Sequence, residues 1–197
     1  DDRLSEAIVQ NLGESNGLPL AKDYLRAFPR SYKEAMMPGS AVADIEQLES
    51  LNSNNTLGML FYRPQEESNE SKSVRLKLYH LNEPIHLSHV LPMLENLGLR
   101  VVGEEPFEVK KSNGDTAWIL DFSMLSAKAI DIQEEREHFQ QAFAAIWAGQ
   151  LENDGFTFYK NENYIIPYSE YIIFDDFFGK YINGDINIIN LSKGSTY

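Results

Sequence analysis

Residues 74–109, VRLKLYHLNEPIHLSHVLPMLENLGLRVVGEEPFEV, decide the fold of this chain because they read as a strand, a loop, a helix and a second strand. In the first part, apolar and polar residues alternate with a period of two, which is typical of a strand with one face on a core. One face of that strand carries Val74, Leu76, Leu78 and His80, and the other carries Arg75, Lys77 and Tyr79. Such a unit is one half of a small α/β sandwich, and the second half must lie elsewhere in the chain.

The helix inside this stretch is expected to begin at Ser88, a residue type that caps helix N-termini. Its apolar face carries Val90, Leu91, Leu94 and Leu97. Pro92 is expected in or near the first turn, where a missing N–H is best tolerated, and Gly98 is expected to close the helix. The next strand starts directly after this glycine.

Two further strands frame the unit. LGMLFYR at residues 57–63 is a strand that ends at Pro64, and the charged segment 65–73 joins it to the strand that follows. TAWILDFSM at residues 116–124 is a returning strand, because the turn at residues 112–115 contains Asn-Gly, a strong hairpin signal. These two segments supply the missing strands of the sandwich.

Residues 131–150 have the strongest helical pattern in the chain. Asp131 and Glu134 form a capping box at its start. Its broad apolar face consists of Ile132, Phe139, Ala142, Phe143, Ile146 and Trp147. The order strand, strand, helix, strand, strand, helix predicts an α+β, ferredoxin-like fold, an antiparallel four-stranded sheet with two helices on one face. In it, residues 57–63 fill the edge position that a C-terminal strand usually occupies.

A helical segment is expected before the sheet, at residues 1–52. Its apolar residues recur at helical spacing, with a turn at 13–17 and a break before Ser40, which is expected to cap a helix over 41–51. These short helices are expected to pack against each other and against the edge of the sheet. The predicted organisation is therefore a helical segment at 1–52, a sandwich at 53–156 and an atypical β-prone tail at 157–197.

The composition narrows the functional classes. The formal net charge of −13 argues against nucleic acid and anionic membrane as main partners, because both attract clustered Lys and Arg. No window approaches the roughly 20 apolar residues of a membrane span, and the first residues lack the pattern of a signal peptide. The chain has no cysteine, which excludes disulfides and thiol nucleophiles. We therefore expect a cytoplasmic protein.

Several long stretches resemble one region of the large bacterial NAD-specific glutamate dehydrogenases. They are AFPRSYKEAMMPGSAVADIEQLESL, LFYRP, RLKLYHLNEPIHLSHVLPMLENLGLRVVGEEPFEV, WILDF and FQQAFAAIWAGQLENDGF. The resemblance covers roughly residues 1–156 and implies a regulatory region of ACT-like domains, which are themselves ferredoxin-like. It also implies a parent enzyme that converts L-glutamate to 2-oxoglutarate and ammonia with NAD.

The fragment itself shows no catalytic machinery of that reaction. No G-x-G-x-x-G follows a strand, and no Lys or Asp lies in a recognisable glutamate-site motif. We therefore predict no catalytic residue, no metal and no cofactor in this fragment, with NAD bound elsewhere in the parent enzyme.

The resemblance points to one candidate ligand site. ACT domains commonly bind amino acids where the first strand meets its helix, often through a loop of the form Asp-x-Pro-Gly. The matching residues are Asn82, Glu83, Pro84 and Ile85, followed by Ser88. Pro84 fits the pattern, but Ile85 stands where a glycine would let the backbone approach a ligand closely.

Three other clusters each allow a functional and a structural interpretation. A zinc site would use His80, Glu83, His86 and His89. None of these forms a helical i, i+4 pair, so polar decoration of a loop is favoured. Acid–base catalysis would use Glu104, Glu105 and Glu108. A solvated strand edge that blocks unwanted pairing is favoured instead. The expected core or interface aromatics are Trp118, Phe139, Phe143 and Trp147.

The tail differs in composition from the rest of the chain. Residues 157–197 contain no alanine and a single leucine, and residues 164–174 and 185–191 read as strands. In the family the corresponding segment looks helical. The tail is thus a foreign or engineered segment, a sequence altered downstream of Phe156, or an extension confined to one lineage.

Two functions follow. The first is a regulatory and oligomerisation module that contacts itself, other domains of the parent enzyme and an amino-acid effector. The alternative is a protein-interaction scaffold without a small-molecule effector, in which the aromatic tail is the interaction element. An independent small enzyme is rejected, because the sequence offers no nucleophile, metal set or cofactor loop.

Overall fold

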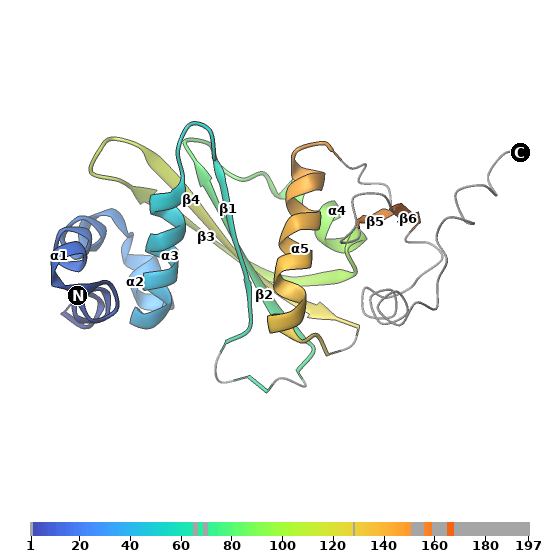
Figure 1. The fold of residues 1–197 in the computed structure, drawn as a ribbon, viewed down its shortest axis with the longest axis horizontal. Helices are drawn as coiled ribbons and strands as arrows, with labels where there is room; N and C mark the ends of the chain where they lie inside the picture. Colours follow the sequence, from blue (N-terminus) through green and yellow to red (C-terminus); the bar gives the residue numbers. More distant parts are fainter. Residues whose placement is uncertain are drawn as a thin grey trace, which may run out of the picture. The chain divides into compact units, whose positions relative to one another are not determined.

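A computed structural model describes residues 2–64, 67–68, 71–127, 129–150, 156–158 and 165–167 of the chain. Its elements are α1 (Asp2–Ala27), α2 (Arg30–Ala35), α3 (Pro38–Ser50), β1 (Leu57–Tyr62), β2 (Ser73–Leu81), α4 (Leu87–Asn96), β3 (Leu99–Lys110), β4 (Thr116–Ser126), α5 (Ile132–Trp147), β5 (Phe156–Phe158) and β6 (Ile165–Pro167) (Figure 1). The four longer strands form one antiparallel sheet in the order β1-β2-β4-β3. This confirms the predicted α+β, ACT-like fold, including the edge position of β1.

The chain divides into two compact units, each of which is described by itself. Unit 1 consists of Asp1–Leu60, Leu76–Ile85 and Glu104–Phe122, and unit 2 of Phe61–Arg75, His86–Gly103 and Ser123–Tyr197. Unit 1 therefore holds α1, α2 and α3 with parts of the sheet, and unit 2 holds α4 and α5 with the other parts. The boundaries predicted from sequence, near residues 52 and 156, stay predictions.

Glycines shape the first helix. The predicted turn at 13–17 appears as a break in α1 at Gly13, whose φ of 77° and ψ of 162° are not helical. Gly17 is needed for packing, because a Cβ there would lie 2.8 Å from the Cα of Val9. The two halves of α1 can therefore approach each other closely.

Two predicted helix caps are wrong. α3 begins at Pro38 with Met37 as its N-cap, so Ser40 lies inside the first turn. Proline at the first helical position has the right φ and no N–H to satisfy, so no side-chain cap is required there. α4 likewise begins before Ser88, with His86 as N-cap, because the carbonyl of His86 already accepts the first helical hydrogen bonds.

The other helix ends follow the sequence more closely. Gly98 closes α4 with a φ of 81°, as predicted. Pro92, expected in or near the first turn of that helix, lies in its second turn. The Asp131 carboxylate accepts hydrogen bonds from the backbone N–H groups of Gln133 and Glu134, at 2.9 and 3.4 Å, which confirms the cap of α5. This helix ends at Trp147, three residues earlier than predicted.

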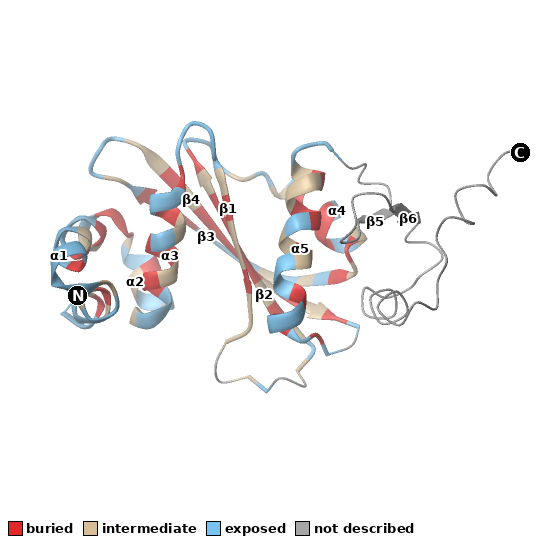
Figure 2. Cartoon of the chain, viewed as in Figure 1, coloured by how far each residue is buried: buried red, intermediate tan, exposed pale blue. Residues whose placement is uncertain are grey.

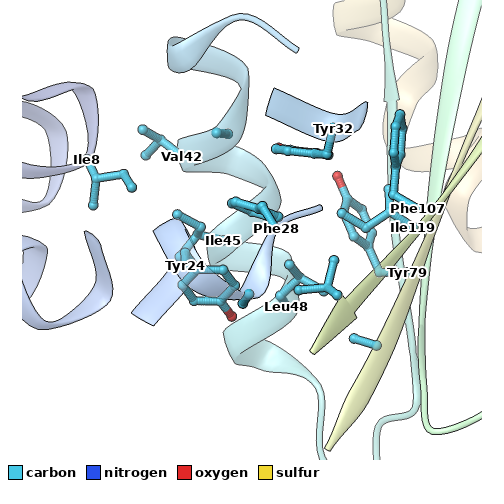
Figure 3. Close-up of a cluster of buried hydrophobic side chains, with 14 of the residues drawn as sticks. Ile8, Tyr24, Phe28, Tyr32, Val42, Ile45, Leu48, Tyr79, Phe107 and Ile119 are labelled. Atoms are coloured by element: carbon cyan, nitrogen blue, oxygen red, sulfur yellow. The ribbon is translucent and has the colours of Figure 1, made fainter. Parts of the chain in front are cut away.

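The core of unit 1 lies between its helices and its strands (Figure 3). Phe28 and Tyr32 stack with ring centroids 4.0 Å apart, and Tyr32 meets Phe107 of β3 edge to face at 5.3 Å. The buried face of α3 adds Ile45 and Leu48 to this cluster. The helical segment thus packs on strands, but the cluster includes Tyr79 of β2 and Ile119 of β4, which are inner strands, so the predicted packing against the edge alone is wrong.

The core of unit 2 is built on α5. Phe139 stacks on Phe61 of β1 at 4.2 Å, and Phe143 continues the row toward Trp147 at 6.2 Å. Phe139 and Phe143 are fully buried, as predicted, whereas Trp147 is half-buried. Trp118 belongs to unit 1 and is half-buried rather than a core residue.

Both faces of β2 are buried, and the expectation of one exposed face is wrong (Figure 2). Leu76 and Leu78 are buried as predicted, but so are Lys77 and Tyr79 on the opposite face. Lys77 can be buried because a partner with the opposite charge lies on α3.

Two further observations complete the fold. No helix among the described residues is long and apolar enough to cross a lipid bilayer.

At the start of the tail, β5 and β6 pair antiparallel, with Thr157 opposite Ile166. Apart from residues 165–167, the strands predicted at 164–174 and 185–191 lie outside the described residues.

Candidate functional site

The first four residues of the predicted effector loop lie in unit 1 directly after β2. Asn82 has a φ of 64°, a left-handed conformation that asparagine tolerates better than most residues. Its backbone N–H donates to the carbonyl of Thr116 at 2.6 Å, and its side-chain oxygen accepts from the Thr116 N–H at 3.2 Å. The carbonyl of Glu83 lies 3.0 Å from Nδ1 of His80. The loop is therefore fixed to β4 and β2.

The remaining loop residue, Ser88, lies in unit 2. It lines a cavity of about 320 Å³ between α4 and α5, together with His89, Pro92, Met93, Ile146 and Trp147. Glu83 and Pro84 are exposed and Ile85 is half-buried. Because Ile85 and Ser88 belong to different units, binding of an effector at this loop stays a prediction.

The histidine cluster does not assemble into a metal site in the part of the chain that is described. No group of three or more His, Cys, Asp or Glu side chains among those residues is placed to hold a metal ion. The rings of His86 and His89 lie 6.1 Å apart near the start of α4, and both residues are exposed. Their placement is that of polar decoration.

The glutamates of β3 lie on an edge strand of the sheet. Glu104, Glu105 and Glu108 are all exposed, and Glu108 lies 3.7 Å from the ammonium of Lys110. Carboxylates that do acid–base work are buried close together, and these three are not buried. The structure confirms that these residues form a solvated edge.

α3 carries a fully buried carboxylate, that of Asp44. Its Oδ2 lies 2.7 Å from Nζ of Lys77, its Oδ1 lies 2.9 Å from the same nitrogen, and the Asp44 and Lys77 side chains are 0% and 1% exposed. Tyr79 donates its hydroxyl to Oδ1 at 2.6 Å, and Tyr32 donates its hydroxyl to Oδ2. We call these four residues the Asp44 cluster.

The Asp44 cluster joins three elements of unit 1, namely α2, α3 and β2. Charged groups lose hydration on burial, and only close pairing with further hydrogen bonds offsets that loss. Here one ammonium and two hydroxyls surround a single carboxylate, so the charge-assisted bonds provide that compensation. The carboxylate is enclosed by protein donors, so the cluster can hold elements together but presents no open position to a substrate.

Sequence reasoning missed the Asp44 cluster, although a signal was present. Asp44 lies between Ala41 and Ile45 on the apolar face of α3, where a charged residue is unexpected. Lys77 similarly interrupts the apolar run of β2. Two opposite charges, each within a buried stretch, are best explained by a pair.

A second polar link lines a cavity of about 160 Å³ in unit 1. Tyr24 of α1 donates its hydroxyl to Oε1 of Glu49 at 2.6 Å, and Nζ of Lys111 lies 3.1 Å from the same oxygen. Lys111 also donates to the backbone carbonyl of Leu48 at 3.2 Å. This link joins α1, α3 and the turn after β3.

The pKa values of Tyr24 and Glu49 shift in opposite directions. Burial, reinforced by the hydrogen bond to Glu49, raises the pKa of the Tyr24 hydroxyl far above its ordinary range. Burial alone would also raise the pKa of the Glu49 carboxyl, but hydrogen bonds from Tyr24 and Lys111 and the Lys111 charge lower it below its ordinary value. Glu49 is therefore held as an anion and Tyr24 as a neutral donor.

Two segments of the chain match known protein families. Residues 7–51 match the family described as glutamate dehydrogenase, helical motif 2, and residues 56–136 match glutamate dehydrogenase, ACT3 domain. The Asp44 cluster thus connects these two segments, since Tyr32 and Asp44 lie in the first and Lys77 and Tyr79 in the second.

Longer proteins named NAD-specific glutamate dehydrogenase are similar to this chain. The chain is 42% identical over 158 residues to the NAD-specific glutamate dehydrogenase of Pseudomonas aeruginosa and 41% identical over 158 residues to that of Halomonas elongata. The enzyme of the same name from Mycobacterium tuberculosis is 29% identical over 165 residues. Each match covers 79% of this chain and 10% of the relative, so the chain spans about a tenth of the length of these curated relatives. The chain therefore belongs to the NAD-specific glutamate dehydrogenase family, as a segment that carries its helical motif 2 and its ACT3 domain.

Proposed function

We propose that this chain is a non-catalytic regulatory and oligomerisation module of a cytoplasmic NAD-dependent glutamate dehydrogenase. In this proposal the full-length enzyme converts L-glutamate to 2-oxoglutarate and ammonia, and its NAD binds outside the present segment. The module contacts a second copy of itself and other domains of the enzyme.

The observation that carries the proposal is the Asp44 cluster. It connects helical motif 2 to the ACT3 strands through a buried ion pair that has no open coordination or reaction position. The link between Glu49 and Lys111 connects the same two segments a second time. Two polar links of this kind favour movement of the joined segments as one body, which is what a module needs in order to pass on a binding event.

The test uses the full-length enzyme with the second link weakened by Lys111→Met, and with Lys110→Met as the matched control. Lys110 is exposed and neighbours Lys111 in sequence. We expect Lys111→Met to change the assembly state, measured by light scattering, or the response to added amino acids. The KM values for L-glutamate and NAD should remain those of the control. A several-fold change in either KM with unchanged assembly would contradict a non-catalytic role.

A thermal-shift screen of this chain against the standard amino acids separates the two functions considered for it. Stabilisation by one amino acid would support an effector, because a ligand that binds only the folded state raises its apparent stability. Alanine in place of Asn82 or Glu83 should then abolish the shift. The absence of any shift would favour the interaction scaffold.

A further inference from the structure

At Phe61, side chains of α5 bond to the outer edge of β1. Because β1 is the first strand of the sheet, one row of its backbone N–H and C=O groups faces away from β2. The N–H of Phe61 donates to Oε1 of Gln140 at 3.1 Å, and the carbonyl of Phe61 accepts from Nε of Arg136 at 2.9 Å. Both outward groups of this residue are therefore already bonded.

The geometry of α5 explains how two side chains reach one residue. Arg136 and Gln140 are four residues apart and so lie on the same face of the helix. Between them, Phe139 stacks on the ring of Phe61, with 4.2 Å between centroids and 22° between planes. The stacked rings hold the helix against the strand, and the flanking side chains offer one donor and one acceptor, as a neighbouring strand would.

A second arginine fixes the same region of unit 2. Arg63, directly after β1, donates to the backbone carbonyls of Ser71, Ser73 and Ile130 at 2.8, 3.1 and 3.0 Å. These bonds join the end of β1 to the segments that lead into β2 and α5. The position of α5 beside Phe61 is therefore supported independently of Arg136 and Gln140.

We propose that Arg136 and Gln140 form an edge lock, which prevents β1 from pairing with the β1 strand of a second copy of this chain. An exposed strand edge is a ready template for such pairing, and an antiparallel pair of identical edges satisfies two-fold symmetry. The inference deepens the proposed function, on whose self-association it rests, by excluding one surface from that contact.

The experiment uses two double variants. The lock variant combines Arg136→Ala and Gln140→Ala in one chain, and the control variant combines Arg100→Ala and Gln141→Ala. Arg100 and Gln141 are exposed, and the control removes the same residue types. Sedimentation velocity gives the dissociation constant of the dimer, and hydrogen exchange reports amide protection at residues 57–62. We expect the lock variant to dimerise about tenfold more tightly than the control, because each lost contact counts twice in a symmetric pair. New amide protection in β1 should accompany this dimerisation.

Several outcomes distinguish the lock from the proposed function. If the wild type self-associates and the lock variant has the same dissociation constant, the edge lock is wrong and the proposed function stands. If the wild type stays monomeric and the lock variant pairs through β1, the lock is supported and the proposed self-association is contradicted. Monomers throughout would overturn both. If circular dichroism shows that the double variant is not folded, Gln140→Leu, which keeps the side-chain volume, should tighten dimerisation several-fold; no change would overturn the lock.

Discussion

Lys77 and Asp44 form a buried ion pair across 33 residues of sequence, with 2.7 Å between Nζ and Oδ2. Both side chains are buried, and the hydroxyls of Tyr32 and Tyr79 also donate hydrogen bonds to the carboxylate. In Figure 3, Tyr32 and Tyr79 project toward each other from the helical segment and from the sheet. The pair therefore marks the contact between helical motif 2 and ACT3.

Removal of the Asp44 carboxylate should lower the stability of the protein. Asp44→Ala leaves the Lys77 ammonium buried without its carboxylate, and we expect it to lower the free energy of unfolding by about 3–5 kcal/mol. Equilibrium unfolding in urea measures this loss. The exposed Glu46 on the same helix provides the control Glu46→Ala, which should change stability by less than about 0.5 kcal/mol.

Replacement of both charged side chains by apolar ones tests whether stability here requires the charges or only the packing. Asp44→Leu combined with Lys77→Met removes the ion pair and fills the space with apolar atoms, so stability should return to within about 1 kcal/mol of the wild type. A double variant as unstable as Asp44→Ala would show that the hydroxyls of Tyr32 and Tyr79 require the carboxylate.

Glu49 should make the protein sensitive to acid. Its folded-state pKa is lowered below the ordinary value of 4.5, so the folded state favours the deprotonated carboxylate. This contribution to stability is present above pH 4.5 and is lost as the pH falls through the folded-state pKa. The stability difference between the wild type and Glu49→Gln, measured by urea unfolding, should therefore shrink on acidification. A difference that does not change with pH would contradict the assigned link.

Asn82 should tolerate glycine better than alanine. Alanine and glycine both lose the bond from the Thr116 N–H to the Asn82 side chain, but the left-handed backbone disfavours only alanine, by about 1–2 kcal/mol, because glycine has no Cβ. Asn82→Ala should thus lower the melting temperature more than Asn82→Gly, as measured by calorimetry. Equal losses would show that the side-chain bond, rather than the backbone conformation, dominates at this position.

Phe143 should be essential for the core of unit 2. It is fully buried and adjoins both Phe139 and Trp147, so Phe143→Ala should cost about 3–5 kcal/mol of unfolding free energy. Denaturant unfolding of Phe143→Leu, which retains most of the apolar volume, provides the comparison and should show a smaller loss. A loss below about 1 kcal/mol for Phe143→Ala would mean that this face is not a packed core.

The local features of the fold could be predicted because their signals are local. Asp131 as a cap and Gly98 as a helix end each depend on residues within one turn, and β1 at the sheet edge follows from the order of elements. The caps at Ser40 and Ser88 failed because a proline in one case and a backbone carbonyl in the other already started the helix earlier. In these two helices, the presence of a serine predicted the N-cap less well than the proline at the start of α3 and the backbone hydrogen bonds at the start of α4.

The order of strands and helices and the family could be read from the amino-acid sequence, since periodicity, turn residues and long similar stretches all lie along the chain. The burial of Lys77 against Asp44 and the bonds of Arg136 and Gln140 to Phe61 became visible only in the folded structure. The physical reason is that the burial of a charge and the pairing of a strand edge depend on groups brought together from distant parts of the sequence. Their energies are set by desolvation and hydrogen-bond geometry, which exist only once the chain has folded.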